Sequence, residues 1–387
     1  MVAIARDGAP VVDGVRLIAY SPTAAPVTGE RDVEEFAASA ENGLAVAAAC
    51  ERLKSRRFEP DLVLGHSGWG ETLFVKDVWP QARLLSYFEF FYRSADSDAD
   101  FDPEFPLEPY VRRRLRLRNA VNALALQSAD WGQTPTKWQR AQYPEREQDR
   151  IAVLHEGVDS EFVRPNRDAR IWLSGGVSLG VGDPIVTFCA RNLEPYRGFH
   201  VFMRALPEIQ RRVPDARVVV LGADGVSYGR LPEAHTSWRE AMRSELGDAI
   251  DLSRVHFLGL VPFRQYLSIL QVSAAHIYLT YPFVLSWSLI EALSAGCLIV
   301  GSNTGPVREA IEDGMNGWLV DFFDPSALAD RVVEALTRPD AGHTLRARAR
   351  ATALERFDLR SVCLPKHIGL WEQLIGRRLT ARPRRTG

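Results

Sequence analysis

Cysteine, long apolar runs and an excess of one charge are all scarce in this sequence. Its four cysteines are isolated, which fits neither a disulfide framework nor a zinc site and indicates a reducing compartment. They are Cys50, Cys189, Cys297 and Cys363. No run of about 18 apolar residues could form a transmembrane helix, and the N-terminus MVAIARDGAP lacks a signal-peptide pattern. Lys and Arg total 47 against 49 for Asp and Glu, so no basic field predicts nucleic-acid binding. These absences predict a soluble cytoplasmic protein.

Length and composition favour two domains of an ordinary globular kind. The chain has 387 residues, well over twice the typical domain length of about 150 residues. Hydrophobic residues make up 46% and charged residues 25% of the chain, as in soluble proteins. Short β-branched runs alternate with longer helical patterns in both halves, which is typical of βαβ units around parallel sheets. We therefore predict two doubly wound α/β domains, with the Gly- and Ser-containing stretch 166–183 as the linker and the entry into the second domain.

The predicted elements alternate between strand and helix along most of the chain. The predicted strands are 14–20, 62–65, 83–88, 151–154, 185–189, 216–221, 255–257, 275–279 and 298–301. The predicted helices are 31–56, 109–128, 198–212, 263–272, 288–294 and 326–337.

The start of the chain departs from the usual doubly wound pattern. The segment Val2–Ala5 has strand character, but no glycine-rich ligand loop follows it. It therefore reads as the second strand of such a domain, and we expect the reading frame to begin about 25–35 residues upstream. A sheet that lacks its central strand leaves backbone groups unpaired, so we expect the chain as given to be poorly stable or weakly active.

The most informative segment is Ala275–Val300, in which a buried strand leads through a short loop into a helix near Ser288. Backbone N–H groups at such a junction are unpaired and attract a phosphate or a sugar hydroxyl. Glu291 is expected in the first turn of this helix, close to that ligand. The same residues also fit a capping box, in which Ser288 and Glu291 satisfy the helix end reciprocally. Spacing alone does not decide between these two interpretations.

Two arginines flank a tight turn directly after the strand 185–189. Arg191 and Arg197 lie where an open α/β sheet binds its ligand, at the carboxyl end of a strand. Two guanidinium groups there suit a diphosphate leaving group, whose developing charge must be neutralised. As isolated surface arginines they would carry little functional weight.

His66 follows the strand Leu62–Leu64 at the carboxyl edge of the first predicted sheet. That position suggests a ligand contact, although a lone histidine more often has a structural role. The surrounding Gly65–Trp69 approaches the nucleophile elbow G-x-S-x-G. Trp69 stands where the last glycine is needed, so we exclude hydrolase chemistry.

Three weaker segments have both a functional and an ordinary interpretation. The aspartates of 96–102 suggest a metal loop but lack the glycine and final glutamate of a calcium loop, so a solvated acidic loop is favoured. The glycines of 175–182 resemble a phosphate loop in composition but precede their strand. The arginine-rich helix Arg112–Arg118 suits a contact with anionic lipid headgroups, although a solvated helix face is favoured.

Together these segments resemble the GT-B glycosyltransferases of family 4, from about His66 to Trp371. Phe188–Gly198 is similar to the family's strand followed by Arg-x(5)-Lys-Gly, with Arg197 in the lysine position. His155–Asp159 is similar to the Asn-Gly-Val-Asp that ends the N-terminal domain, with Glu156 replacing Asn. The further matches are Val255–Gly259 with Val261 and Pro262, Ser302–Val320, and Asp324–Leu328.

The resemblance implies transfer of a sugar from a nucleotide-diphospho-sugar, with retention of anomeric configuration and without a metal or a cofactor. The donor is expected on the C-terminal domain. The acceptor, which is a saccharide, a lipid-linked compound or a small molecule, is expected on the N-terminal domain across a cleft. Arg191 and Arg197 would hold the diphosphate, and Glu291 the ribose hydroxyls. His66 would lie by the sugar. Donor contacts are also expected at Phe283, Val284, Leu285, Ser286 and Val261.

The same resemblance gives the expected domain limits: an N-terminal domain at 1–165, a C-terminal domain at 166–356, and a helix at 357–378 that returns to the N-terminal domain. The basic tail 379–387 is expected to be disordered. The protein is expected in the cytoplasm. A further expectation is a peripheral contact at the inner face of the membrane through Arg112–Arg118.

Two departures from the family pattern keep other functions open. Phe283 stands where the family's Glu-x(7)-Glu pattern has its first Glu, which usually binds sugar hydroxyls, so the sugar's identity does not carry over. The first strand and its glycine-rich loop are missing. Both departures favour a non-catalytic GT-B-like protein that binds a nucleotide or a partner, or an inactive truncated form. A nucleotide-sugar epimerase or a phosphorylase-like enzyme is a further rival, and scarce lysine argues against the latter.

Overall fold

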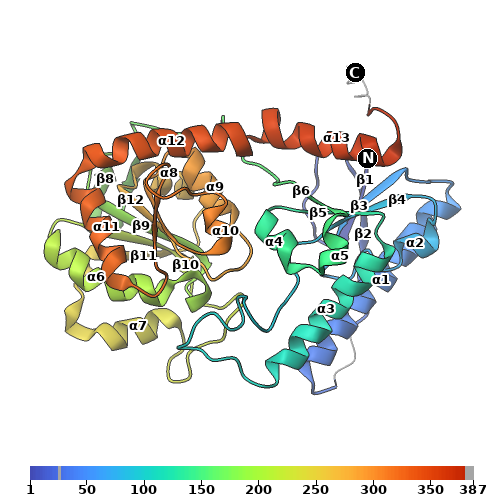
Figure 1. The fold of residues 1–387 in the computed structure, drawn as a ribbon, viewed down its shortest axis with the longest axis horizontal. Helices are drawn as coiled ribbons and strands as arrows, with labels where there is room; N and C mark the ends of the chain where they lie inside the picture. Colours follow the sequence, from blue (N-terminus) through green and yellow to red (C-terminus); the bar gives the residue numbers. More distant parts are fainter. Residues whose placement is uncertain (25–27, 380–387) are drawn as a thin grey trace. The chain divides into compact units, whose positions relative to one another are not determined.

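The computed structural model describes residues 1–24 and 28–379, and its contacts divide the chain into two compact units (Figure 1). The N-terminal unit comprises Met1–His155 and the segment that begins at Pro365, and the C-terminal unit comprises Glu156–Leu364. Each unit has a parallel sheet with helices packed on it, so the prediction of two Rossmann-like α/β domains is confirmed. Residues 380–387 of the expected tail lie outside the described residues.

The N-terminal unit is built on a four-stranded parallel sheet in the order β3-β4-β5-β6. Its strands are β3 (Leu62–His66), β4 (Arg83–Tyr87), β5 (Trp131–Thr134) and β6 (Ile151–Val153). The first two strands, β1 (Val2–Arg6) and β2 (Arg16–Tyr20), form a separate parallel pair. The helices are α1 (Arg31–Ser55), α2 (Val75–Val78), α3 (Val111–Ser128), α4 (Lys137–Gln142), α5 (Glu145–Gln148) and α13 (Leu364–Ile375).

The two long helices of this unit, α1 and α3, pack against each other (Figure 1). Each buries one face because its small and apolar residues recur at helical spacing. The buried residues of α1 include Asn42, Val46, Ala49, Cys50 and Leu53. Those of α3 are Leu115, Val121, Asn122, Ala125 and Leu126. The N-terminal half of α1 and the middle of α3 reach the carboxyl ends of β3 and β4, where they line a common pocket.

The C-terminal unit contains a six-stranded parallel sheet in the order β11-β10-β9-β12-β13-β14. The strands are β9 (Ile185–Asn192), β10 (Arg217–Ala223), β11 (Val255–Gly259), β12 (Ala275–Tyr278), β13 (Ile299–Ser302) and β14 (Trp318–Val320). The helices are α6 (Phe199–Arg212), α7 (Trp238–Leu246), α8 (Phe263–Val272), α9 (Trp287–Ser294), α10 (Gly305–Arg308), α11 (Pro325–Thr337) and α12 (Pro339–Phe357).

The strand order of this sheet reverses between β9 and β12. From β9 the chain builds outward through β10 and β11 on one side, and β12 then starts the other side, next to β9. In doubly wound sheets the connections that leave two such neighbouring strands run to opposite faces, and the crevice lies at the carboxyl ends of those strands. This is the position at which doubly wound sheets bind their ligands, and it places the turn after β9 beside the loop after β12.

The stretch 166–183 is not a linker, although it lies at the entry of the C-terminal unit as expected. The stretch contains an antiparallel hairpin of β7 (Arg170–Trp172) and β8 (Ser178–Gly180). Ile171 and Leu179 are buried in one cluster with Ile185, so the hairpin belongs to the core of the C-terminal unit. Each strand has only three residues, which is too short for alternation to be visible in the sequence.

The division between the units falls at 155/156, earlier than the expected limit at 165. The reason is that the chain after Glu156 is tied to helices of the C-terminal unit. Ser294 Oγ of α9 donates to the carbonyl of Val163 at 2.6 Å, and Arg350 of α12 donates to the same carbonyl at 2.9 Å. On the other side of the division, His367 of α13 lies with its Nε2 3.2 Å from the carbonyl oxygen of His155.

Helices α7 and α12 were not predicted from the sequence. The 19-residue α12 is rich in arginine and alanine and shows no clear apolar stripe, although Leu345, Ala349, Ala353 and Phe357 are buried. Within the described residues, every helix is too short or too polar to cross a membrane.

Candidate functional site

The turn after β9 places both predicted arginines at the crevice of the C-terminal unit. Arg191 is exposed at the end of β9, and Arg197 follows six residues later in a turn of 3-10 helix, Pro195–Arg197. Gly198 ends this turn with φ of +67°, and a Cβ there would lie 2.3 Å from Cβ of Leu279. Only glycine therefore allows the chain to turn so closely beside the end of β12.

Arg197 is fixed by groups from the loop after β12. Its Nη1 donates to Thr280 Oγ1 at 2.9 Å and to the carbonyl oxygen of Val284 at 3.4 Å. Its guanidinium carbon lies 5.5 Å from the ring centroid of Tyr228. None of these partners is a carboxylate, and neither Arg191 nor Arg197 forms an ion pair within residues 1–24 and 28–379. Among the described residues, the turn after β9 therefore carries two positive charges without a carboxylate partner.

The tyrosine that faces Arg197 is held in place by a buried carboxylate that sequence reasoning missed. Glu194 is 1% exposed and accepts hydrogen bonds from the backbone N–H groups of Ser227, Tyr228 and Gly229, at 3.0–3.2 Å. These bonds fix the loop after β10, so that the Tyr228 ring lies 4.6 Å from that of Phe283. Glu194 lies between Arg191 and Arg197 in the chain. No feature of the sequence indicated that it would bond to the loop after β10.

The loop from β12 to α9 combines buried side chains with an ordered helix start. Phe283 and Leu285 are each 3% exposed, so their side chains belong to the core and only their backbone can meet a ligand. Ser286 is the N-cap of α9, with its side chain accepting from the N–H of Ser288. The N–H of Ser286 donates to Tyr278 Oη at 2.9 Å. Val284 and Val261 are partly buried.

The capping box suggested for Ser288 and Glu291 is wrong. The helix begins one residue earlier, at Trp287, and its cap is Ser286, so Glu291 lies beyond the first turn. Glu291 instead accepts a hydrogen bond from Tyr266 Oη at 2.8 Å. It lines a small cavity of about 150 Å³ together with Trp287 and Ile290. Burial raises the pKa of this carboxyl, and the Tyr266 hydroxyl opposes that rise.

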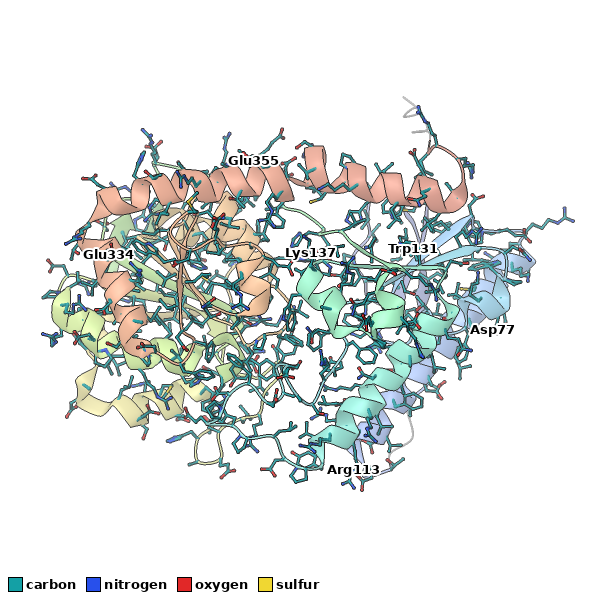
Figure 2. All side chains as sticks on the ribbon, viewed as in Figure 1. Asp77, Arg113, Trp131, Lys137, Glu334 and Glu355 are labelled. Carbon is teal, nitrogen blue, oxygen red and sulfur yellow. The ribbon has the colours of Figure 1, made fainter. Side chains whose placement is uncertain are left out.

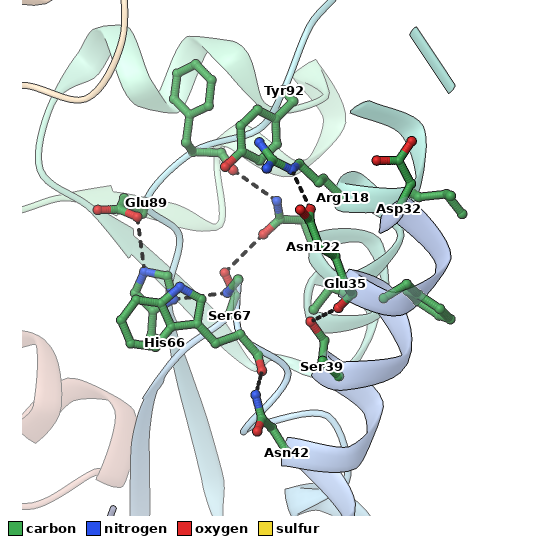
Figure 3. A pocket seen from close by; sticks show the side chains of 17 residues that line it. Asp32, Glu35, Ser39, Asn42, His66, Ser67, Glu89, Tyr92, Arg118 and Asn122 are labelled. Carbon is green, nitrogen blue, oxygen red and sulfur yellow. Dashed lines mark hydrogen bonds and ion pairs between the residues drawn. The ribbon is translucent and has the colours of Figure 1, made fainter. Parts of the chain in front are cut away.

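His66 lies in the N-terminal unit, at the edge of a pocket of about 350 Å³ (Figure 3). The pocket lies at the carboxyl ends of β3 and β4, which supply His66 and Glu89, and is completed by residues of α1 and α3. The Nδ1 atom of His66 accepts a hydrogen bond from the N–H of Gly68 at 3.1 Å, so its Nε2 carries the proton. That Nε2 lies 3.4 Å from Glu89 Oε2. The His66 ring lies between those of Trp69 and Tyr87, with centroids 4.9 and 5.5 Å away.

The far wall of this pocket, formed by α1 and α3, is a network of opposite charges. Arg118 Nε lies 3.2 Å from Glu35 Oε2, and Arg114 Nη2 donates to Glu35 Oε1 at 2.9 Å. Arg114 Nε also lies 3.2 Å from Asp32 Oδ1. Although burial opposes ionisation of Glu35, Arg118 and Arg114 hold its pKa below the usual value. Two of the five arginines of 112–118 are therefore engaged by carboxylates, while Arg112, Arg113 and Arg116 are exposed.

The acidic loop 96–102 is less solvated than its sequence indicated. Asp98 and Asp102 are buried, and Asp100 accepts hydrogen bonds from the N–H groups of Asp96 and Ser97. The carboxylates thus order the loop's own backbone, which is the usual role of aspartate in a turn.

Two family models match the chain along most of its length. The glycosyl transferase family 4 group matches residues 1–163, and the glycosyl transferases group 1 matches residues 183–338. The chain belongs to the family 4 glycosyltransferases.

Curated relatives of this family 4 chain are similar over about half of it. The GDP-mannose-dependent alpha-(1-6)-phosphatidylinositol monomannoside mannosyltransferase of Mycolicibacterium smegmatis is 28% identical over 239 residues, 58% of this chain and 56% of the relative. The D-inositol 3-phosphate glycosyltransferase of Corynebacterium urealyticum is 31% identical over 196 residues, 49% of this chain and 44% of the relative. The chain thus spans about half the length of the curated relatives it matches.

Solved structures of low sequence identity share the GT-B fold of this family 4 chain. Sucrose-phosphate synthase from Thermosynechococcus elongatus superposes with a TM-score of 0.71 at 17% identity, covering 97% of this chain and 89% of that chain. Anabaena Alr3699/HepE in complex with UDP-glucose gives a TM-score of 0.62 at 16% identity, covering 86% of this chain and 83% of that chain.

In this family 4 chain, the structure brings only some of the predicted site residues into contact. Arg197 contacts the backbone of Val284, and Phe283 packs against Tyr228, which faces Arg197. Among the described residues, Arg191 contacts neither Arg197 nor Glu291, although it belongs to the same turn. Glu291 lies on α9, the helix that follows the loop after β12. Four residues at these sites were not predicted from the sequence. Three of them contact a predicted residue: Glu89 lies beside His66, Tyr228 beside Arg197 and Tyr266 beside Glu291. The fourth, Glu194, fixes the backbone of Tyr228.

Proposed function

We propose that this chain is a glycosyltransferase that moves a sugar from a nucleotide-diphospho-sugar to an acceptor, with retention of anomeric configuration and without a metal. The observation that carries the proposal is the crevice between β9 and β12, where Arg191 and Arg197 lie without carboxylate partners. A diphosphate is the ligand whose charge suits such a position. Membership in family 4 adds the reaction class.

Each residue at the crevice supports one part of the donor. Arg191 and Arg197 donate hydrogen bonds to the diphosphate and offset the negative charge that develops as the glycosidic bond breaks. Backbone groups of Val284–Ser286 lie at the N-terminus of α9, whose dipole favours the same phosphates. Glu291 accepts hydrogen bonds from the ribose hydroxyls in its ionised form. Tyr228 supplies an aromatic face beside Arg197.

The acceptor binds in the pocket of the N-terminal unit, where His66 donates from Nε2 and is oriented by Gly68 and Glu89. The acceptor hydroxyl attacks the anomeric carbon on the face that the diphosphate leaves, and the leaving phosphate takes its proton, so the reaction needs neither a protein nucleophile nor a protein base. The names of relatives and neighbours suggest donors and acceptors for a first panel. The mannosyltransferase is named for GDP-mannose, the HepE structure for UDP-glucose, and the Corynebacterium relative for D-inositol 3-phosphate.

The test is a panel of nucleotide sugars, in which release of the nucleoside diphosphate is measured with and without acceptors. Proton NMR of the product gives its anomeric configuration, and parallel reactions with EDTA test the independence from metal. We expect release with at least one donor, retention, and no effect of EDTA. A protein that binds nucleotide sugars in a thermal-shift assay but releases no nucleotide with any acceptor would instead support the non-catalytic alternative.

The exposed arginines of α3 could contact anionic lipid headgroups or form a solvated helix face, and both interpretations stay predictions. Arg112, Arg113 and Arg116 supply three positive charges on one helix, which suits a peripheral contact with anionic headgroups at the inner face of the membrane. Flotation with vesicles of phosphatidylglycerol and phosphatidylcholine separates the two. Binding that a triple Arg→Gln variant loses supports the membrane contact, and no binding at low salt supports a solvated face.

A further inference from the structure

The pocket of the N-terminal unit is lined by several hydrogen-bond acceptors, and most of its side-chain donors other than His66 already bond to the protein (Figure 3). Its lining contains three carboxylates, Asp32, Glu35 and Glu89, but one arginine, Arg118. That arginine is engaged by Glu35 at 3.2 Å. Arg114, which lies behind the same wall, contacts Asp32 and Glu35. The positive charges near this pocket are thus already neutralised by its own carboxylates.

The neutral donors that line the pocket are directed at protein acceptors. Asn42 Nδ2 donates to the carbonyl of Trp69 at 2.9 Å, and Asn122 Nδ2 donates to that of Phe90 at 2.9 Å. Ser39 Oγ donates to the carbonyl of Glu35 at 3.1 Å. Ser67 Oγ lies 3.0 Å from the carbonyl of Tyr87. Carboxylates, by contrast, are acceptors only, with several lone-pair positions each. The lining therefore suits a ligand that brings its own donors.

Aromatic surface completes the pocket. Trp69 is 62% exposed and lies beside the His66 ring, and Tyr92 lies under Arg118, whose guanidinium carbon is 5.3 Å from the ring centroid. An exposed indole face next to carboxylates suits a ring with apolar C–H faces and hydroxyl groups at its edge. The cavity of about 350 Å³ is large enough for one sugar ring.

We propose that the acceptor is an uncharged or cationic polyol, such as a neutral sugar or an amino sugar, and that phosphate esters are rejected. This inference rests on the transferase function proposed above and names the substrate class of its acceptor pocket. A phosphate is an acceptor-only anion, so it would face the carboxylate of Glu89, while Arg118, the one arginine of the lining, is already engaged by Glu35. An ammonium group would instead be attracted, most directly by Glu89, whose side chain is 42% exposed.

The test compares matched acceptors: myo-inositol with D-inositol 3-phosphate, and glucose with glucosamine and glucose 6-phosphate. Affinity for the full-length chain is measured by saturation-transfer NMR, and turnover by nucleotide release with the donor that the panel selects. We expect the uncharged or amino member of each set to bind at least tenfold more tightly than its phosphate ester. A phosphate ester that binds equally or more tightly, or a pocket that binds none of these probes, would overturn the proposal.

Two variants and a control tie the result to the pocket. Glu35→Gln removes the counter-charge of Arg114 and Arg118, so we expect severalfold tighter binding of the phosphate esters. Glu89→Gln should weaken glucosamine more than glucose. Glu51→Gln, at an exposed position of α1 outside the pocket, should change neither. If neither pocket variant changes the preference, the pocket does not select the acceptor.

The binding and turnover measurements separate this inference from the proposed function. Turnover of a nucleotide sugar with phosphate esters as the better acceptors would leave the transferase function standing and refute the acceptor class. Preferential binding of neutral or amino probes without turnover of any donor would support the selectivity of the pocket and refute the transferase.

Discussion

The two candidate sites of this chain use arginine in opposite ways. In the N-terminal unit, Arg114 and Arg118 lie against Glu35, so their charge is neutralised within the fold. In the C-terminal unit, Arg191 and Arg197 have no carboxylate partner within the described residues, and the nearby Glu194 is instead surrounded by backbone N–H groups. The comparison teaches that an arginine's availability to a ligand depends on where the neighbouring carboxylates are directed, which the residue type does not reveal.

The largest expected effect comes from removing an unpaired arginine. Arg191→Ala should lower kcat by on the order of a hundredfold, about 3 kcal/mol, because the leaving diphosphate loses a charged donor. Steady-state nucleotide release measures it. Arg243→Ala, at an exposed position of α7, is the matched control and should leave the rate unchanged. Full turnover of Arg191→Ala would remove the diphosphate role from this residue.

A smaller loss is expected when the buried carboxylate of this site becomes an amide. Glu194→Gln keeps the shape but replaces one acceptor oxygen by an NH₂ group that faces backbone N–H donors, so we expect a loss of about 1–3 kcal/mol in the free energy of unfolding. Urea unfolding measures it, with the exposed Glu233→Gln as control. Because the loop carries Tyr228, the KM for the donor should also rise. An unchanged unfolding curve would show that the loop does not depend on Glu194.

The pH dependence of donor binding should follow the ionisation of Glu291. Burial raises the pKa of this carboxyl and the Tyr266 hydroxyl lowers it. The ionised form accepts from the ribose, so the KM for the donor should rise as the pH falls through this raised pKa. Tyr266→Phe removes the opposing hydrogen bond, and the rise should then begin at a higher pH. Glu291→Gln should flatten the profile. Identical profiles for wild type and Tyr266→Phe would contradict the role of the ionised carboxylate.

The smallest effect is expected from the paired arginines. Glu35→Gln should cost at most about 1 kcal/mol at neutral pH, because its side chain is 34% exposed and solvent screens the pair. Arg118 and Arg114 lower the folded-state pKa of Glu35 from 4.5. The stabilisation is therefore present above that value and is lost as the pH falls through the lowered pKa. Urea midpoints at neutral and acid pH should differ between wild type and variant only at neutral pH. A difference that persists in acid would point to packing instead of charge.

The sequence by itself determined the fold class, the family and the positions of most long elements. Runs such as 185–189 and 275–279 are apolar except for one residue each, Thr187 and His276, and a strand buried on both faces needs such a largely apolar run wherever it lies in the sheet. The arginine turn and the loop into α9 are also local, since each follows directly from the end of a strand. Other elements were not predicted because their apolar pattern is too short or too weak to recognise. Examples are the three-residue strands β7 and β8 and the alanine-rich α12.

Only the tertiary structure decided which of these local features meet. The order of the sheet places β12 beside β9, so that Arg197 reaches Val284, 87 residues later in the chain. The same packing turned Glu291 toward Tyr266 and away from the helix cap, and brought Glu35 of α1 to the arginines of α3, 79 residues away. Hydrogen bonds and ion pairs act over a few ångströms, whereas a sequence records separation along the chain. The charge available in each pocket is therefore a property of the folded molecule.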